Sequence, residues 1–351
     1  MSKIEDLLNR TVREDRGIKR WVVVVGIAIA LSTTMGSLLG ILFLADVDGY
    51  LHDNKEIINL YDFYDQRVGV NETAVFFIGS SIVGNSIYPT EVNNIVKRSY
   101  PNVTAYNLAV SGDVPIERVL EIQKIIDAKP SLVIYGITYR SVTADIDYAR
   151  FFERIKPVYS RIDIRNDSLF LYTLEEKKYF APLNDIEKIR YLRSAVEYKC
   201  SGIHRSINYS YDPYGGEDLR KSMGNVPQIK MVSEANDPNC QWRPFVTNES
   251  TRYKDALIYI VKTLQDAGIP VIILNMPIYP LISEKMPDES KSNFCNLLDE
   301  TGVVWYNFDC YLDEDCFRST GHTNFDGALK FAPRMADIII EQVEKDVIHY
   351  T

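Results

Sequence analysis

Residues 74–84 read AVFFIGSSIVG, a short apolar run followed at once by glycines and serines. Five apolar residues bounded by turn signals predict a strand that is buried on both faces. A serine on a tight turn between a parallel strand and a helix exposes its hydroxyl at the rim of the sheet, where the next backbone N–H groups point at an incoming carbonyl oxygen. The turn at Gly79, Ser80 and Ser81 therefore suits a nucleophile.

Four more runs of this kind follow along the chain, at 104–109 (TAYNLA), 132–137 (LVIYGI), 271–275 (VIILN) and 303–308 (VVWYNF). Helical patterns lie between or after them, at 115–128, 252–267 and 327–347. Alternating strands and helices indicate an α/β domain with a mainly parallel sheet, so we expect three α/β/α layers of flavodoxin-like type. Ligands of such sheets bind at the carboxyl ends of the strands.

The alternation stops between residues 140 and 250. This stretch is rich in Tyr, Arg, Lys, Asp and Glu, and contains helix-like pieces such as 185–197. We interpret it as one large insertion over the strand ends. The insertion is either a lid or substrate-recognition subdomain, or a segment with a purely structural role, and both interpretations stay open.

The N-terminal part contains 25 consecutive uncharged residues, Trp21–Ala45. As a helix they span roughly 37 Å, enough to cross a bilayer core with some tilt. The alternative is a cleaved signal peptide, but the apolar core is longer than a typical h-region and no clear A-x-A site follows it. We predict a retained signal anchor, which divides the chain into a cytoplasmic tail (1–20), a membrane helix (21–45), a polar stalk (46–70) and a domain (71–351).

Charges on either side of this helix predict its orientation. The preceding cations are Lys3, Arg10, Arg13, Arg16, Lys19 and Arg20, whereas Asp46, Asp48, Asp53 and Glu56 follow with only Lys55. Because Lys and Arg stay on the cytoplasmic side, the domain is expected outside the cell membrane. Five N-x-S/T sequons, usable only there, begin at Asn71, Asn102, Asn166, Asn208 and Asn248. Gly36 and Gly40 form a G-x-x-x-G pair through which two helices can pack as a homodimer, although glycine is common in membrane helices anyway.

Composition argues against other classes of protein. With 39 Lys+Arg and 48 Asp+Glu the net charge is −9, whereas a nucleic-acid partner needs a concentrated basic surface. The cysteines are Cys200, Cys240, Cys295, Cys310 and Cys316. They lack C-x-x-C spacing and histidine partners, so we expect no metal and no cofactor. Disulfides are permitted outside the cell, and the pairs Cys310–Cys316 and Cys200–Cys240 are the first to expect.

A nucleophilic serine needs a base, and the chain has four histidines. His52 lies in the predicted stalk, His204 in the insertion and His349 in the C-terminal tail. His322 follows the fifth predicted strand and precedes the last helix, which places it at the carboxyl edge of the sheet. Elimination and topology therefore favour His322.

These stretches resemble sequence blocks of the SGNH (GDSL-like) hydrolase family. Residues 79–81 (GSS) are similar to the first block, whose third residue is the nucleophile, so the resemblance implies that role for Ser81. Residues 107–113 (NLAVSGD) look like the second block. The glycine of that block donates a backbone N–H to the oxyanion, which implies this role for Gly112.

Residues 322–327 (HTNFDG) resemble the fifth block, whose histidine is the general base and corresponds to His322. The resemblance covers residues 74–138 and 252–345. Three blocks in the family's order, each at the end of a predicted strand, make a fairly specific pattern.

Three positions depart from the family's pattern, and the first is Ser80, which stands where the first block has an aspartate. Thr138 stands where the third block has an asparagine as a further oxyanion donor; its hydroxyl can donate, with shorter reach, beside the N–H groups of Ser81 and Gly112. Ser319 stands where the family has an aspartate, which fixes the imidazole tautomer and stabilises the imidazolium. The candidates for this third member are Ser319 itself, Asp313, Glu314 and Asp315, or a backbone carbonyl.

In layout the chain is similar to membrane-anchored members of the family, the D-alanyl transfer protein of teichoic acid synthesis and exported polysaccharide O-acetyltransferases. This resemblance implies an acyl hydrolase or acyltransferase acting on esters of cell-surface glycans or lipids, beside a multi-span acyl-donor membrane protein. Two alternatives remain. The first is a catalytically inactive SGNH-like domain that binds surface glycan or a membrane partner, and the residues Ser319 and Thr138 favour it. The second is a structural surface protein, which is compatible with the sequons.

Overall fold

The computed structural model describes residues 3, 5, 18–37, 55–143, 164–180, 214–215, 226–237, 240 and 251–348. The chain divides into two units, Met1–His52 with Leu183–His204, and Asp53–Pro182 with Arg205–Thr351. The described part of the first unit is essentially one helix, and that of the second is an α/β domain.

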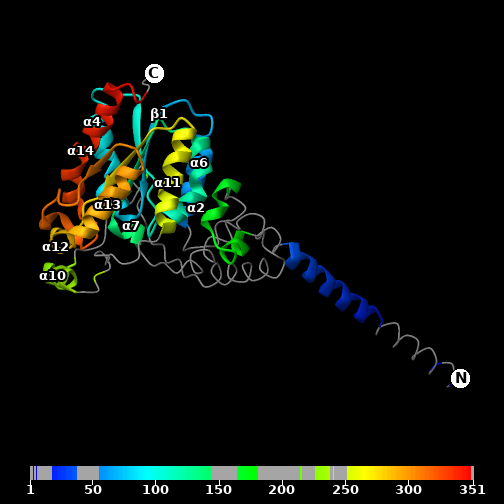
Figure 1. The fold of residues 1–351 in the computed structure, drawn as a ribbon. Helices are drawn as coiled ribbons and strands as arrows, with labels where there is room; N and C mark the ends of the chain where they lie inside the picture. Colours follow the sequence, from blue (N-terminus) through cyan, green and yellow to red (C-terminus); the bar gives the residue numbers. More distant parts are fainter. Residues whose placement is uncertain are drawn as a thin grey trace. The chain divides into compact units, whose positions relative to one another are not determined.

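The helix of the first unit is Ile18–Ser37, dark blue in Figure 1. Its mean hydropathy is 1.5, and it is long and apolar enough to cross a membrane by length and composition. The Thr34 hydroxyl donates to the carbonyl of Ala30 at 2.7 Å, which satisfies a polar group inside an apolar helix. The rest of the predicted span, residues 38–45, lies outside the described residues, and with it Gly40 of the predicted Gly36–Gly40 pair.

The domain is built on a five-stranded parallel sheet, which confirms the predicted fold class. Its strands are β1 (Thr73–Gly79), β2 (Val103–Asn107), β3 (Leu132–Ile137), β4 (Val271–Asn275) and β5 (Trp305–Asn307). Their order in the sheet, β2-β1-β3-β4-β5, is the flavodoxin-like one. Every residue of β1, β3 and β4 is buried, because helices cover both faces, and this explains why these strands are continuous apolar runs.

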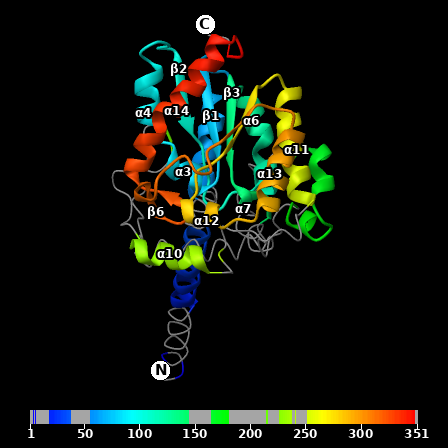
Figure 2. The same cartoon turned by 60° about the vertical axis from the view of Figure 1, so that its left-hand side comes forward.

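Helices form a layer on each face of the sheet (Figures 1 and 2). On one face, α4 (Pro89–Val96) packs against α14 (Phe325–Glu344). On the other, α6 (Ile122–Ala128) packs against α11 (Thr251–Asp266). The chain order reverses between β1 and β3, and the carboxyl ends of these two strands are where such a fold places its ligand.

The predicted helix 115–128 is three segments: α5 (Pro115–Arg118), a 3₁₀ turn η3 (Val119–Glu121) and α6. The tighter turn coincides with an ion pair between buried Arg118 and Glu121, three residues apart, at 2.6 Å. Side chains at this spacing eclipse in a 3₁₀ helix, which brings the two groups together.

Residues 55–67 lie in the segment expected to be a stalk, but they form helix α2 (Lys55–Arg67). Its Leu60, Tyr61 and Tyr64 are buried, and the helix packs on α6. Sequence reasoning missed this helix because the segment is polar in composition and its buried face is mostly tyrosine and phenylalanine.

The remaining elements are α3 (Ser81–Ser86), α7 (Tyr139–Thr143), η5 (Asn166–Leu171), η6 (Glu176–Phe180), α10 (Gln228–Asn236), α12 (Pro280–Glu284), α13 (Asp288–Glu300), η8 (Glu314–Cys316), β6 (Phe317–Ser319) and β7 (His322–Thr323). Most of the predicted insertion, and with it the expectation of a lid, lies outside the described residues. Cys310 and Cys316 are free, which corrects the expected disulfide between them. The η8 turn buries Cys316, whereas Cys310 is exposed.

Candidate active site

The turn after β1 brings Ser81 to the carboxyl edge of the sheet as the first residue of α3. Gly79 has a φ of +144°, and a Cβ there would meet the carbonyl oxygen of Gly136 on β3 at 2.3 Å. Only glycine fits this conformation and this close approach of two strands. Ser80 is the N-cap of α3, and its hydroxyl accepts from the N–H of Ile82 at 3.4 Å.

His322 is carried by a short antiparallel hairpin of β6 and β7, which periodicity in the sequence did not predict. The register pairs Ser319 with His322 across this hairpin. Asn324, two residues on, caps α14: its side chain accepts from the N–H of Gly327 at 2.9 Å. The residues of the 322–327 motif thus hold the histidine between a hairpin and the start of a helix.

A buried hydroxyl fastens this hairpin to the helix that begins with Ser81. Thr323 is 1% exposed, and its Oγ1 donates to the carbonyl oxygen of Asn85 on α3 at 2.8 Å. The same hydroxyl lies 3.3 Å from Oγ of Ser86. Thr323 therefore helps to set the separation of the two predicted catalytic residues, although sequence reasoning did not single it out.

Ser81, His322 and Ser319 form a chain of hydrogen bonds. Ser81 Oγ lies 2.9 Å from His322 Nε2, and Ser319 Oγ lies 2.9 Å from His322 Nδ1. If Nε2 accepts the Ser81 proton, Nδ1 carries the ring proton and donates it to Ser319. The Ser319 hydroxyl can thus select the tautomer that a base requires, but it brings no negative charge to the imidazolium.

The surroundings favour a neutral His322 ring. Burial, followed by the positive charges of Arg318 and Arg140, lowers the pKa of His322 to about 4. Burial likewise lowers the pKa of Arg140. A neutral imidazole is the form that accepts a proton, so His322 is ready to act as a base at neutral pH, although a weak one. Sequence reasoning did not single out these two arginines, whose charges act on the imidazole in the folded domain.

The three predicted oxyanion donors differ in their accessibility. Ser81 opens α3, where the first N–H groups of a helix have no partner within it. Gly112 is exposed and has a φ of +77°, in a turn closed by a hydrogen bond from the Asp113 N–H to the Val110 carbonyl at 3.1 Å. Thr138 is 2% exposed, and its hydroxyl oxygen is buried and has no hydrogen-bond partner in the described part of the chain. In this conformation Thr138 does not offer its hydroxyl to a substrate.

Two of the three predicted carboxylate candidates contact other partners. Glu314 Oε2 accepts from the Tyr279 hydroxyl at 2.9 Å. Asp315 is exposed and pairs with Lys330 at 3.4 Å. Asp313 is exposed at the start of η8. The structure therefore brings Ser319 to the imidazole and directs Glu314 and Asp315 elsewhere.

We expect kcat/KM for an ester to rise through about pH 4 and to be level from about pH 6 upward. The base must be neutral, and a histidine whose pKa is about 4 is neutral above that pH. The measurement is the pH profile of p-nitrophenyl acetate hydrolysis by the full-length chain. A limb at about pH 6.5, the ordinary value for histidine, would contradict the described environment of His322.

Thr323→Val should lower kcat about fivefold and the free energy of unfolding by about 1 kcal/mol, the usual contribution of one buried hydrogen bond. Valine keeps the shape of threonine but cannot donate to the Asn85 carbonyl. Thr323→Ser is the matched control, because it keeps the hydroxyl. Equal kcat values for the two variants would show that the hydrogen bond does not position His322.

No protein-family model matches the sequence, and a search among curated proteins gives no match. Among solved structures, the fold is similar to a "putative acylhydrolase" from Bacteroides fragilis, at 10% identity and a TM-score of 0.37, over 82% of this chain and 97% of that one. It is also similar to a catalytic mutant of an acetylxylan esterase from Geobacillus stearothermophilus, at 12% identity and a TM-score of 0.37, over 78% and 96% of the two chains.

Proposed function

We propose that this chain is a serine acyl hydrolase or acyltransferase, with Ser81 as nucleophile and His322 as general base. The single observation that carries the proposal is the 2.9 Å contact between Ser81 Oγ and His322 Nε2 at the carboxyl edge of the sheet. A serine within hydrogen-bond reach of a base, which is itself oriented by a third group, is the arrangement that activates a hydroxyl. The resemblance of the three sequence blocks to the SGNH family supports the same chemistry.

In this proposal Ser81 Oγ attacks the carbonyl carbon of an ester as its proton passes to His322 Nε2. The oxyanion accepts hydrogen bonds from the N–H groups of Ser81 and Gly112. The carbon–oxygen bond to the alcohol then breaks, and His322 returns the proton to the leaving oxygen. Water or a second alcohol then attacks the acyl carbon and gives its proton to His322. The bond from this carbon to Ser81 Oγ breaks, and His322 returns the proton to Ser81 Oγ, so the same intermediate serves hydrolysis and transfer.

We further propose that the domain works outside the cell membrane, on esters of surface glycans or lipids. The support is the apolar helix Ile18–Ser37 together with the six cations among the 20 residues that precede the predicted span. An acyltransferase there needs an acyl donor, and a multi-span membrane protein is the partner that the resemblance suggests. The test of this orientation is a reporter protein that is active on only one side of the membrane, fused in turn to each end of the chain.

The test of the activity is labelling of the full-length chain in detergent micelles by a fluorophosphonate probe. We expect one phosphonyl adduct, placed on Ser81 by mass spectrometry of the peptide, with the Ser80→Ala variant still labelled. An adduct on another serine would overturn the assigned nucleophile.

A second candidate function is a non-catalytic domain that binds a surface glycan or a membrane partner. The observation that favours it is the neutral hydroxyl of Ser319 at His322 Nδ1, where an efficient triad has a carboxylate. A chain that melts cooperatively, forms no adduct and cleaves no p-nitrophenyl acetate would support this function and refute the first.

A further inference from the structure

We infer that Arg118 is a positioning residue. Its buried guanidinium joins the Ser81 turn to the Gly112 turn and so fixes the relative positions of the two proposed oxyanion donors, the N–H groups of Ser81 and Gly112. The inference rests on the proposed function, because it assigns a task within that site. It concerns a residue that does not itself touch the substrate.

Arg118 holds the Gly112 turn through the next residue, Asp113. Its Nε and Nη2 both donate to Asp113 Oδ2, at 3.1 and 2.8 Å. The Arg118 side chain is 0% exposed and that of Asp113 is 3% exposed. Because the Asp113 N–H also closes the turn onto the Val110 carbonyl, Gly112 is held between two anchored residues.

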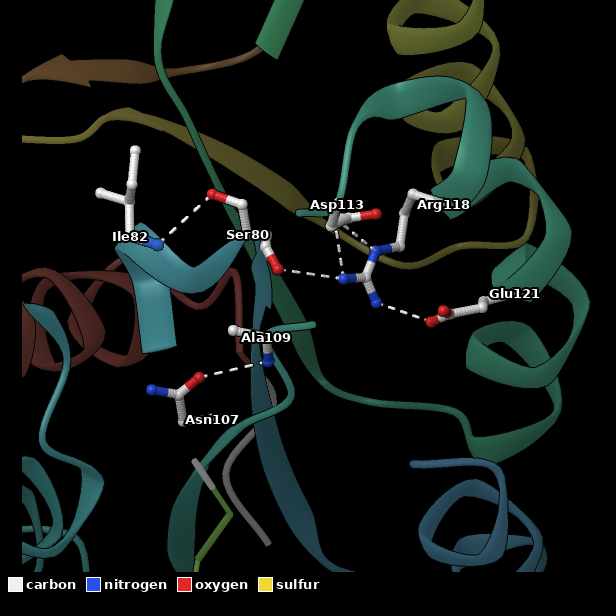
Figure 3. A network of polar contacts seen from close by, with 8 residues as sticks. Ser80, Ile82, Asn107, Ala109, Asp113, Arg118 and Glu121 are labelled. Carbon is white, nitrogen blue, oxygen red and sulfur yellow. Dashed lines mark hydrogen bonds and ion pairs between the residues drawn. The ribbon is translucent and has the colours of Figure 1, made fainter. Parts of the chain in front are cut away.

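The same guanidinium reaches the Ser81 turn through the last residue of β1. Arg118 Nη2 donates to the carbonyl oxygen of Gly79 at 3.2 Å, and that oxygen also accepts from the N–H of Val110 at 2.9 Å. Figure 3 shows the guanidinium of Arg118 between Asp113 and Glu121. One Nη2 group thus contacts both turns.

Glu121 completes the cluster from the side away from the turns. Arg118 Nη1 donates to Glu121 Oε2 at 2.6 Å, within the same helical stretch. Burial alone lowers the pKa of Arg118, but the two carboxylates reverse this effect and raise it well above its ordinary value. The guanidinium therefore stays charged, and its planar fork fixes the direction of each contact.

A buried charge can serve stability alone, and this is the alternative to exclude. Two positions of the cluster separate the roles. Asp113 adjoins Gly112 in the chain, whereas Glu121 contacts the same guanidinium but lies in η3, on no part of the proposed oxyanion site. Removing the charge of either Asp113 or Glu121 disturbs the ion-pair cluster. Only the removal at Asp113 also releases the Gly112 turn.

The experiment compares Asp113→Asn with Glu121→Gln in the full-length chain in detergent micelles, with p-nitrophenyl acetate as substrate and thermal melting in parallel. Each change replaces a carboxylate by the amide of the same size. We expect Asp113→Asn to lower kcat about 10- to 100-fold, since a donor misplaced by about 1 Å costs on the order of 100-fold, with little change in KM. Glu121→Gln should leave kcat within about threefold of the wild type, although Tm falls in both.

Equal losses of kcat in the two variants, or a loss that follows Tm, would overturn the positioning role while the proposed function stands. A wild-type chain that neither hydrolyses the ester nor reacts with the fluorophosphonate would refute the proposed function, and this inference with it. If Asp113→Asn has no cooperative melting transition, Asp113→Glu replaces it, because it keeps both charges and moves the carboxylate by one methylene. A kcat close to that of the wild type in a folded Asp113→Glu would also overturn the inference.

Discussion

Replacement of Ser81 by alanine should lower kcat/KM for p-nitrophenyl acetate about 1,000-fold or more, and should abolish labelling by a fluorophosphonate. The hydroxyl of Ser81 is the one that lies 2.9 Å from His322 Nε2, so its removal leaves the imidazole with no oxygen to activate. His322→Ala should give a loss of the same order, because the two groups act as one unit and their effects do not add. The residual rate would come from substrate binding and the oxyanion donors.

Ser80→Ala is the matched control for this experiment. Ser80 is adjacent and similarly half-buried, but its hydroxyl accepts from the N–H of Ile82 at 3.4 Å, a long N-cap contact. Its loss should cost about 0.5 kcal/mol of stability and leave kcat within about threefold of the wild type. A loss in Ser80→Ala as large as in Ser81→Ala would mean that the turn, and not one hydroxyl, carries the activity.

Ser319→Asp should raise kcat about tenfold and move the acidic limb of the pH profile upward from about pH 4, because a carboxylate favours the charged imidazolium. A higher pKa makes His322 a stronger base, and each unit is worth about 1.4 kcal/mol between its two protonation states. The tautomer is already selected by the Ser319 hydroxyl, so only the charge is gained. The measurements are paired pH–rate profiles of the variant and the wild type.

Ser319→Asn separates charge from shape in this experiment. Asparagine matches aspartate in size and can accept from Nδ1 through its carbonyl oxygen, but it is neutral. Its profile should therefore keep the limb near pH 4. If the Asp and Asn variants have the same kcat and the same acidic limb, the positive charges of Arg318 and Arg140 offset the new carboxylate. That result would contradict the prediction that a carboxylate at this position strengthens His322 as a base.

Much of the fold could be predicted from the sequence because its strands are buried on both faces. The runs of β1, β3 and β4 are continuous apolar segments bounded by turn residues, and their alternation with helical patterns indicates a parallel sheet. The expectation that Ser81 and His322 share one edge required only that both follow parallel strands. Whether they act together in catalysis stays a prediction.

The contacts that complete the candidate site could not be predicted, because they join segments far apart in the chain. Arg118 belongs to an amphipathic pattern in which a charged residue normally faces water, and only Asp113, Glu121 and the Gly79 carbonyl make its burial favourable. Thr323 likewise looks like any strand residue until its hydroxyl meets α3. The β6–β7 hairpin is too short to show periodicity.

The proposed nucleophile and base are separated by 241 positions of the chain. A ribosome adds about 5–20 residues per second, so the histidine is synthesised roughly 10–50 s after the serine. Throughout that interval the nascent chain carries a serine without a base and cannot attack an ester. In the proposed enzyme, activity therefore begins only after His322 has been made, and a product that terminates before this residue is inert even if its first strands fold.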